Sequence, residues 1–133
     1  MQRHLFVNLP VSDLNRAISF FGALGFEFEA NFTDDNATCM LVGRDASVML
    51  LVRDFFASFI DRSVADPTEA TTALIAISAD SRDGVDQLVE AALAQGAKAG
   101  LTQDHGFMYS RAFYDLDGHC WVVMTMEETQ TSD

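Results

Sequence analysis

The sequence predicts an α+β domain built from two βαβββ modules in tandem. A strand-like segment is followed by an amphipathic helix and three more strand-like segments, and the same order recurs in the second half. The two copies keep a nearly constant offset, with Gly25 corresponding to Gly96 and Val48 to Cys120. We expect mixed curved sheets that form a cleft, with one helix per module on the outer face. The expected single domain of 133 residues consists of module one (3–53), a linker (54–71), module two (72–126) and an acidic tail (127–133).

Module one begins with the apolar strand-like run Leu5–Leu9, which Pro10 closes. Ser12 is a suitable helix N-cap, with Asp13 in the first turn. The helix that follows carries an apolar stripe at positions i, i+3, i+4 and i+7, formed by Leu14, Ala17, Ile18 and Phe21. Gly25 suits the left-handed position just after the helix. Three strands are then expected at 26–32, 37–42 and 48–52.

Module two repeats this order. A strand is expected at 73–77, and Asp80 or Ser81 can cap the next helix. The apolar stripe of that helix is formed by Val85, Leu88, Val89 and Ala92, and Gly96 follows its end. The last strands are expected at 97–101, 107–114 and 120–126. Between the modules, a short amphipathic helix is predicted from four residues that belong either to the core or to a pocket lid, Phe55, Phe56, Phe59 and Ile60.

Composition excludes several classes of partner. The net charge is −12 and no basic stripe is present, which argues against nucleic acid and against anionic membrane surfaces. No apolar run is long enough to cross a bilayer, and the first residues show no signal-peptide h-region or cleavage site, so we expect no signal peptide. Cys39 and Cys120 lie in apolar runs, as buried free thiols do. We therefore expect a cytoplasmic protein.

Two segments resemble a known family. They are VNLPVSDLNRAISFFGALGF (Val7–Phe26) and FYDLDGHCWVV (Phe113–Val123). The first is similar to the strand, cap and helix end of the vicinal oxygen chelate superfamily, which includes glyoxalases, extradiol dioxygenases and bleomycin-resistance proteins. The second resembles the superfamily's D-x-D-G hairpin before the last strand. The repeat on which the resemblance rests covers residues 3–126.

The resemblance implies a metal site, but the residues do not match it. In catalytic members of the superfamily, His and Glu side chains hold a divalent ion that chelates two substrate oxygens. The corresponding positions here carry only apolar side chains, Phe6, Leu50, Leu74 and Val122. A shifted register gives Val48, Met49, Leu51 or Val123, and only His4 and Asn8 on the first strand offer donors. The two other histidines have other expected roles, His105 in a solvated loop and His119 in the last turn. We expect neither a metal nor another cofactor.

Four residues are the candidate ligand-binding set: Asn8, Tyr109, Arg111 and Phe113. Asn8 shares a strand face with His4 and Phe6, and the other three share a face of the segment 107–114. If that face lines the cleft, Arg111 can clamp a carboxylate or phosphate while Tyr109 or Phe113 stacks on a planar ring. Otherwise, Arg111 pairs with a carboxylate of this acidic chain and the aromatic residues belong to the core.

Three functions remain open at this point. The first is a metal-independent small-molecule-binding protein of the glyoxalase/bleomycin-resistance type, which holds a planar or anionic compound in an apolar cleft. The alternative is a glyoxalase-like lyase or isomerase with displaced or no metal ligands, in which His105 or Tyr109 acts as general acid or base. The third is a subunit that mainly associates with another chain. The resemblance also implies a homodimer, with modules paired within one chain or swapped between two.

Overall fold

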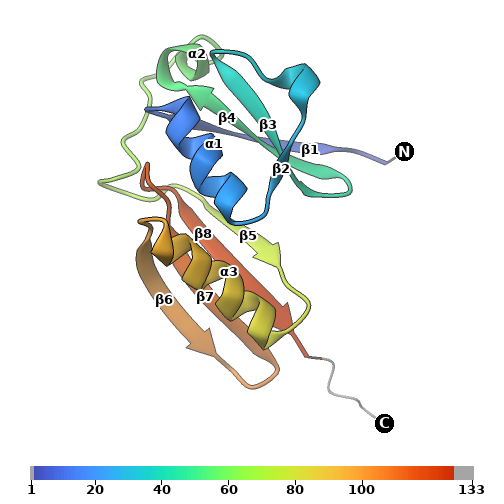
Figure 1. Ribbon diagram of the computed structural model, residues 1–133. Helices are drawn as coiled ribbons and strands as arrows, with labels where there is room; N and C mark the ends of the chain where they lie inside the picture. The colour runs from blue at the N-terminus through green and yellow to red at the C-terminus, as the bar shows by residue number, and fades with distance from the viewer. Residues whose placement is uncertain (1, 128–133) are drawn as a thin grey trace. The chain divides into compact units, whose positions relative to one another are not determined.

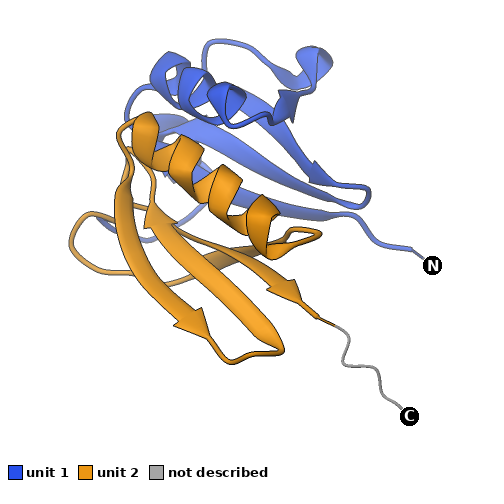
Figure 2. Cartoon of the chain, turned by 60° about the horizontal axis from the view of Figure 1, so that its bottom comes forward, with its two compact units in different colours: residues 1–66 blue, residues 67–133 orange. Residues whose placement is uncertain are grey.

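The computed structural model describes residues 2–127. The chain divides into two compact units, residues 1–66 and 67–133, which Figure 2 shows in different colours. Of the predicted acidic tail, only Glu127 falls within the described residues. None of the helices in the described part is long and apolar enough to cross a membrane.

Unit 1 contains a four-stranded mixed sheet in the order β1-β4-β3-β2. Its strands β1 and β4 are parallel, and the other neighbours are antiparallel. Helix α1 packs on β3 and β4 (Figure 1). The elements are β1 (Leu5–Val11), α1 (Leu14–Ala23), β2 (Glu27–Phe28), the 3-10 helix η1 (Ala30–Phe32), β3 (Ala37–Gly43), β4 (Ala46–Val52) and α2 (Arg53–Ala57).

Unit 2 repeats this topology in the order β5-β8-β7-β6, with β5 and β8 parallel. Helix α3 runs along β7 and β8 (Figure 1). The elements are β5 (Leu74–Ser78), α3 (Arg82–Ala94), β6 (Lys98–Asp104), β7 (Met108–Tyr114) and β8 (Cys120–Met126). The predicted α+β fold of two tandem βαβββ modules is thus confirmed.

The ends of the two main helices show the repeat most directly. Gly25 and Gly96 both have positive φ angles, 102° and 105°. After each glycine, the next backbone N–H bonds back to the last turn of the helix, from Phe26 to Phe21 O and from Ala97 to Ala92 O. These bonds satisfy carbonyls that the helix leaves free. Donors, acceptors and glycines all keep the same offset between the modules, the one that the sequence predicts.

Three local expectations are wrong. Pro10 does not close the first strand, because β1 continues through it to Val11. The N-cap of α1 is Asp13 and not Ser12, because the Asp13 carboxylate accepts a bond from Arg16 N–H at 3.0 Å. The strand expected at 26–32 is reduced to Glu27–Phe28. The chain then turns into η1, where the Thr33 hydroxyl donates to Glu29 O at 2.9 Å and stabilises the turn.

Each sheet has one face that the helix covers. In unit 1 this face includes Met40, Val48 and Leu50, all 0–1 % exposed. A Cβ atom placed on Gly22 of α1 would lie 3.9 Å from the Phe28 ring. Phe28 is the register partner of Met40, so α1 lies on the same side of the sheet as Met40. In unit 2 the covered face carries Phe113 and Trp121. Since side chains alternate along a strand, the intervening residues point to the opposite, open face.

The core of unit 2 contains one polar anchor. Trp121 is fully buried and stacks on Phe113 with the ring planes at 5°. Its indole N–H donates to one Asp115 oxygen at 3.0 Å, while the backbone N–H groups of Asp117 and His119 donate to the other. Burial raises the pKa of Asp115, although these donors and His119 favour the charged form. The carboxylate thus fixes both the β7–β8 turn and the indole.

Arg82 holds the β6–β7 hairpin in place, and we call its contacts the Arg82 clamp. Its guanidinium forms a two-pronged bond to Asp104 at 2.8 and 2.9 Å and donates to Gly106 O at 3.0 Å. The same group lies 4.7 Å from the Tyr109 ring centroid. The Arg82 bond holds the pKa of Asp104 well below its usual range. The first turn of α3 is therefore tied to the tip of the hairpin.

We predict that Asp115→Ala destabilises unit 2 by about 1–3 kcal/mol, because it leaves the indole and two backbone N–H groups without their acceptor. Asp115→Asn should fall between wild type and Asp115→Ala, since its oxygen can still accept the two backbone bonds. Trp121 is the only tryptophan, so its fluorescence in a urea titration reports on this unit. Asp35→Asn, an exposed turn residue, is the control and should change nothing.

The Arg82 clamp predicts a pH dependence. Because the pKa of Asp104 is lowered by folding, its contribution to stability is present above the ordinary aspartate pKa of about 3.9 and is lost as pH falls further. The difference in urea midpoint between wild type and Asp104→Asn should therefore be largest above about pH 5 and shrink toward pH 3. A difference that stays constant over this range would exclude the clamp as its source.

Candidate functional site

The candidate site is a pocket of unit 1 on the open face of its sheet. It has a volume of about 500 Å³ and is lined by Asn8, Leu51, Phe56, Phe59 and Ile60. Asn8 comes from β1, Leu51 from β4, and the other three from α2 and the turn that follows it. Four of the five lining residues are apolar, and Asn8 supplies the one polar side chain.

Strand register places Asn8 in this pocket. Asn8 pairs with Met49 of the neighbouring parallel strand, so it lies on the face opposite to Val48 and Leu50. Its amide donates only a long bond, 3.4 Å, to the carbonyl of Phe6. The Asn8 side chain is exposed and retains hydrogen-bonding capacity for a ligand.

The aromatic wall of the pocket is a short segment with little packing of its own. No residue of α2 is fully buried, and Phe59 is 67 % exposed. The rings of Phe55 and Phe59 meet edge to face with centroids 5.0 Å apart. Arg53 donates to Val64 O at 3.0 Å and fastens the following loop to the start of α2. The wall is thus positioned by a few local contacts.

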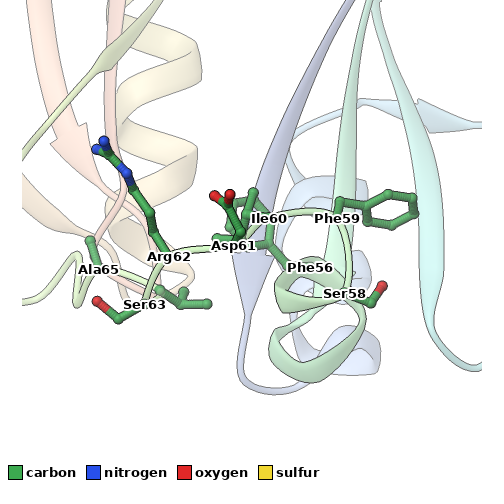
Figure 3. Close-up of a pocket in the computed structure, with 9 residues that line it drawn as sticks. Phe56, Ser58, Phe59, Ile60, Asp61, Arg62, Ser63 and Ala65 are labelled. Atoms are coloured by element: carbon green, nitrogen blue, oxygen red, sulfur yellow. The ribbon is translucent and has the colours of Figure 1, made fainter.

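A second hollow adjoins the pocket. It has a volume of about 730 Å³ and is formed by a single stretch of chain between Phe56 and Ala65. Figure 3 shows its lining side chains, with the Phe59 ring directed away from Arg62. Because Phe56, Phe59 and Ile60 line both hollows, a movement of this segment changes both.

A histidine–serine pair lies on the same strand face as Asn8. His4 Nε2 is 2.8 Å from the Ser47 hydroxyl, and the His4 ring stacks on Phe6 with centroids 4.4 Å apart. Ser47 is the register partner of Phe6 and is 2 % exposed. The stack and the hydrogen bond together fix the imidazole. Neither Ser47 nor this pair is visible as a motif in the sequence, since the two residues are 43 positions apart.

The other three candidate ligand residues, Tyr109, Arg111 and Phe113, lie in unit 2, on the face that α3 covers. The Tyr109 hydroxyl donates to Asp86 at 2.5 Å, and Arg111 donates to Asp86 and Glu90 at 3.1 and 2.8 Å. Phe113 has no exposed surface. The structure brings these three residues together in one unit, and it places Asn8 in the other.

The charges of this cluster support one another. The hydrogen bond from Tyr109, followed by the contact with Arg111, lowers the pKa of Asp86. The same bond to Asp86 raises the pKa of the Tyr109 hydroxyl. Glu90 and then Asp86 raise the pKa of Arg111, which therefore stays charged. The cluster joins β7 to α3 through two carboxylates of the helix.

The residues of the open faces do not fit the divalent ion that the superfamily implies. On the first and last strands of each module, where the superfamily implies the ligands, the open face carries Phe6, Asn8, Ser47, Met49 and Leu51 in unit 1, with His4 just before β1, and Leu74, Ala76, Ser78, Cys120, Val122 and Met124 in unit 2. Within residues 2–127, no three His, Cys, Asp or Glu side chains lie close enough together to hold a metal ion. One expected position is wrong: Leu50 faces α1, because strand alternation puts Met49 and Leu51 on the open face.

Comparison with known proteins agrees with this architecture. Residues 3–43 match the family model described as bleomycin resistance protein-like N-terminal. A search of curated protein sequences finds no match.

Similar solved structures span nearly the whole chain. A hypothetical protein from S. aureus is 26% identical, covers 94% of each chain and superposes with a TM-score of 0.78. A glyoxalase/bleomycin resistance protein/dioxygenase family enzyme from Burkholderia phytofirmans is 16% identical over 94% of this chain and 99% of that one, with a TM-score of 0.76. A fosfomycin resistance protein from Listeria monocytogenes is 19% identical over 96% of each chain, with a TM-score of 0.68. The chain therefore has the fold of the glyoxalase/bleomycin-resistance proteins, as the resemblance of its two end segments predicts.

Proposed function

We propose that this protein is a metal-independent binding protein that holds a small, planar, mainly apolar compound in the pocket beside Asn8. The pocket itself carries the proposal: its volume of about 500 Å³ lies in the usual range for ligand sites. Two phenylalanines and two aliphatic residues offer an apolar surface to a flat ring. A single amide can then orient a polar group of the ligand by donating or accepting a hydrogen bond.

The contacts of Arg111 give less support to an anionic ligand than the pocket gives to an apolar one. Arg111, the predicted anion clamp, already binds Asp86 and Glu90, and its side chain is only 17% exposed. Phe113 is buried against Trp121. A ligand role for Tyr109, Arg111 and Phe113 remains a prediction, and their contacts favour a structural role. Only Asn8 of the candidate set is part of the proposed site.

A second function, a lyase or isomerase that uses no metal, is favoured by the His4–Ser47 pair. An imidazole held 2.8 Å from a hydroxyl, on the strand face that carries Asn8, is a suitable group for proton transfer. If this function is correct, His4→Phe should abolish turnover and leave ligand affinity unchanged. If the protein only binds its ligand, the bound compound will be recovered unchanged from wild type and variant alike.

We also propose that the protein is a cytoplasmic homodimer with no nucleic-acid or membrane partner. The edge strands β1 and β5 expose apolar side chains, with Phe6 53% and Leu74 56% exposed. Exposed apolar edge strands favour pairing with another chain. Sedimentation equilibrium should show that wild type is a dimer. The Phe6→Lys variant should have a higher dimer dissociation constant.

Because Phe59 lines the pocket, we expect it to contribute to the binding of a planar apolar probe. Nile red, a neutral planar dye, should bind wild type with a rise in fluorescence, and Phe59→Ala should weaken its binding roughly tenfold through loss of an aromatic contact surface. Asn8→Ala should leave the affinity of this apolar probe nearly unchanged. The matched control is Phe32→Ala, because Phe32 is 64% exposed and lies outside the pocket. Equal losses for Phe59→Ala and Phe32→Ala would exclude the pocket as the binding site.

Metal independence is tested separately. Purified protein should contain no stoichiometric divalent ion by mass spectrometry, and dialysis against EDTA should leave Nile red affinity and thermal stability unchanged. The reason is that the open-face residues within 2–127 provide no set of three hard donors. A tightly bound divalent ion whose removal abolishes binding would contradict the proposal.

A further inference from the structure

Unit 2 contains a separate cavity of about 410 Å³, where β6 begins and β7 ends. Its walls are the loop 67–71, the residues that start β6 and the turn between β7 and β8. The loop and the turn lie in close contact at Gly118, which has a φ of 95°. A Cβ at this position would be 2.9 Å from Pro67 O, so only glycine permits the approach. This contact holds the loop against the turn at one wall of the cavity.

Two opposite charges line this cavity without neutralising each other. Lys98 and Glu69 are both exposed, and neither forms an ion pair with the other or with any residue in the range 2–127. By contrast, Arg82 and Arg111 each bind carboxylates. Lys98 is also the only lysine of a chain with a net charge of −12. An unpaired cation and an unpaired anion thus face one hollow from different segments.

The rest of the lining supplies apolar surface. Tyr114 is the register partner of Lys98 and is half-buried, and Leu116 lies in the following turn. The third charged residue of the lining, Asp115, is already occupied by the indole of Trp121 and two backbone N–H groups. Asp115 thus belongs to the fold, and Lys98 and Glu69 are the charges open to a ligand.

We propose that this cavity binds a small zwitterion of the α-amino acid type. Its carboxylate contacts the Lys98 ammonium, its ammonium group contacts the Glu69 carboxylate, and its side chain lies against Tyr114 and Leu116. A ligand that carries both charges satisfies both residues, whereas a simple anion would pair with Lys98 and meet repulsion from Glu69. The cavity lies wholly within the second unit, so the proposal is independent of the pocket beside Asn8.

The single lysine makes a direct test possible. Reductive ¹³C-methylation of the full chain keeps the positive charge and labels Lys98 and the N-terminal amine, which serves as an internal control in the NMR spectrum. Leucine or phenylalanine should shift the Lys98 signal to saturation and leave the N-terminal signal in place. The corresponding acid without its amine, and the amine without its carboxylate, should bind at least about tenfold more weakly. No saturable shift with either amino acid, or equal binding of the acid alone, would overturn the proposal.

Two variants assign the contacts. Lys98→Gln and Glu69→Gln should each weaken binding of the amino acid roughly tenfold in calorimetry, since each removes a charge-assisted hydrogen bond. Both residues are exposed, so circular dichroism and Trp121 fluorescence should match wild type. Asp35→Asn removes an exposed charge in unit 1 and should bind as wild type does. Unchanged affinity in either cavity variant would exclude that residue from the site and refute a zwitterion held by both charges.

Discussion

In each module, one helix covers one face of a four-stranded sheet, and the side chains of every strand alternate between that face and the open one. This constraint decides the role of most residues singled out from the sequence. Side chains on the covered face, such as Phe113 and Val48, pack in the core. The opposite face carries the exposed Asn8, which lines the pocket, but also Ser47 and Leu51, each only 2 % exposed. A shift of one residue in register exchanges the two sets.

The cluster around Arg111 shows how the constraint acts. Arg111 and Tyr109 have the residue types of an anion and ring site, yet their strand position directs them toward α3. There they meet Asp86 and Glu90, which stand one helical turn apart and join the helix to β7. A guanidinium that already binds two carboxylates is held in place, and few of its N–H donors remain for a ligand. The hydrogen bonds of Arg111 and Tyr109 therefore stabilise the packing of α3 on β7.

The proposed pocket in unit 1 follows from what remains. Its sheet presents Asn8 and Leu51 on the open face, and α2 with the turn after it adds two phenylalanines and an isoleucine. Where the superfamily implies donors for a divalent ion, this sheet has mainly apolar side chains, and His4, Asn8 and Ser47 are its polar groups. Such a lining favours ligands through apolar contact and one directed hydrogen bond, and it provides no electrostatic means to stabilise an enolate. These residue types are the basis on which we propose metal-free binding.

The sequence by itself determined the order of elements, the repeat with its constant offset at the helix ends, and the residue types at the superfamily's end segments. These are local properties, because helix periodicity, capping and positive-φ glycines depend on near neighbours in the chain. Only the tertiary structure decided that Tyr109, Arg111 and Phe113 face α3, that Leu50 faces α1, and that Lys98 and Glu69 line one cavity. Strand alternation defines two faces but does not say which one a helix will cover. That choice depends on contacts between residues far apart in the chain, such as Arg111 with Asp86 and His4 with Ser47.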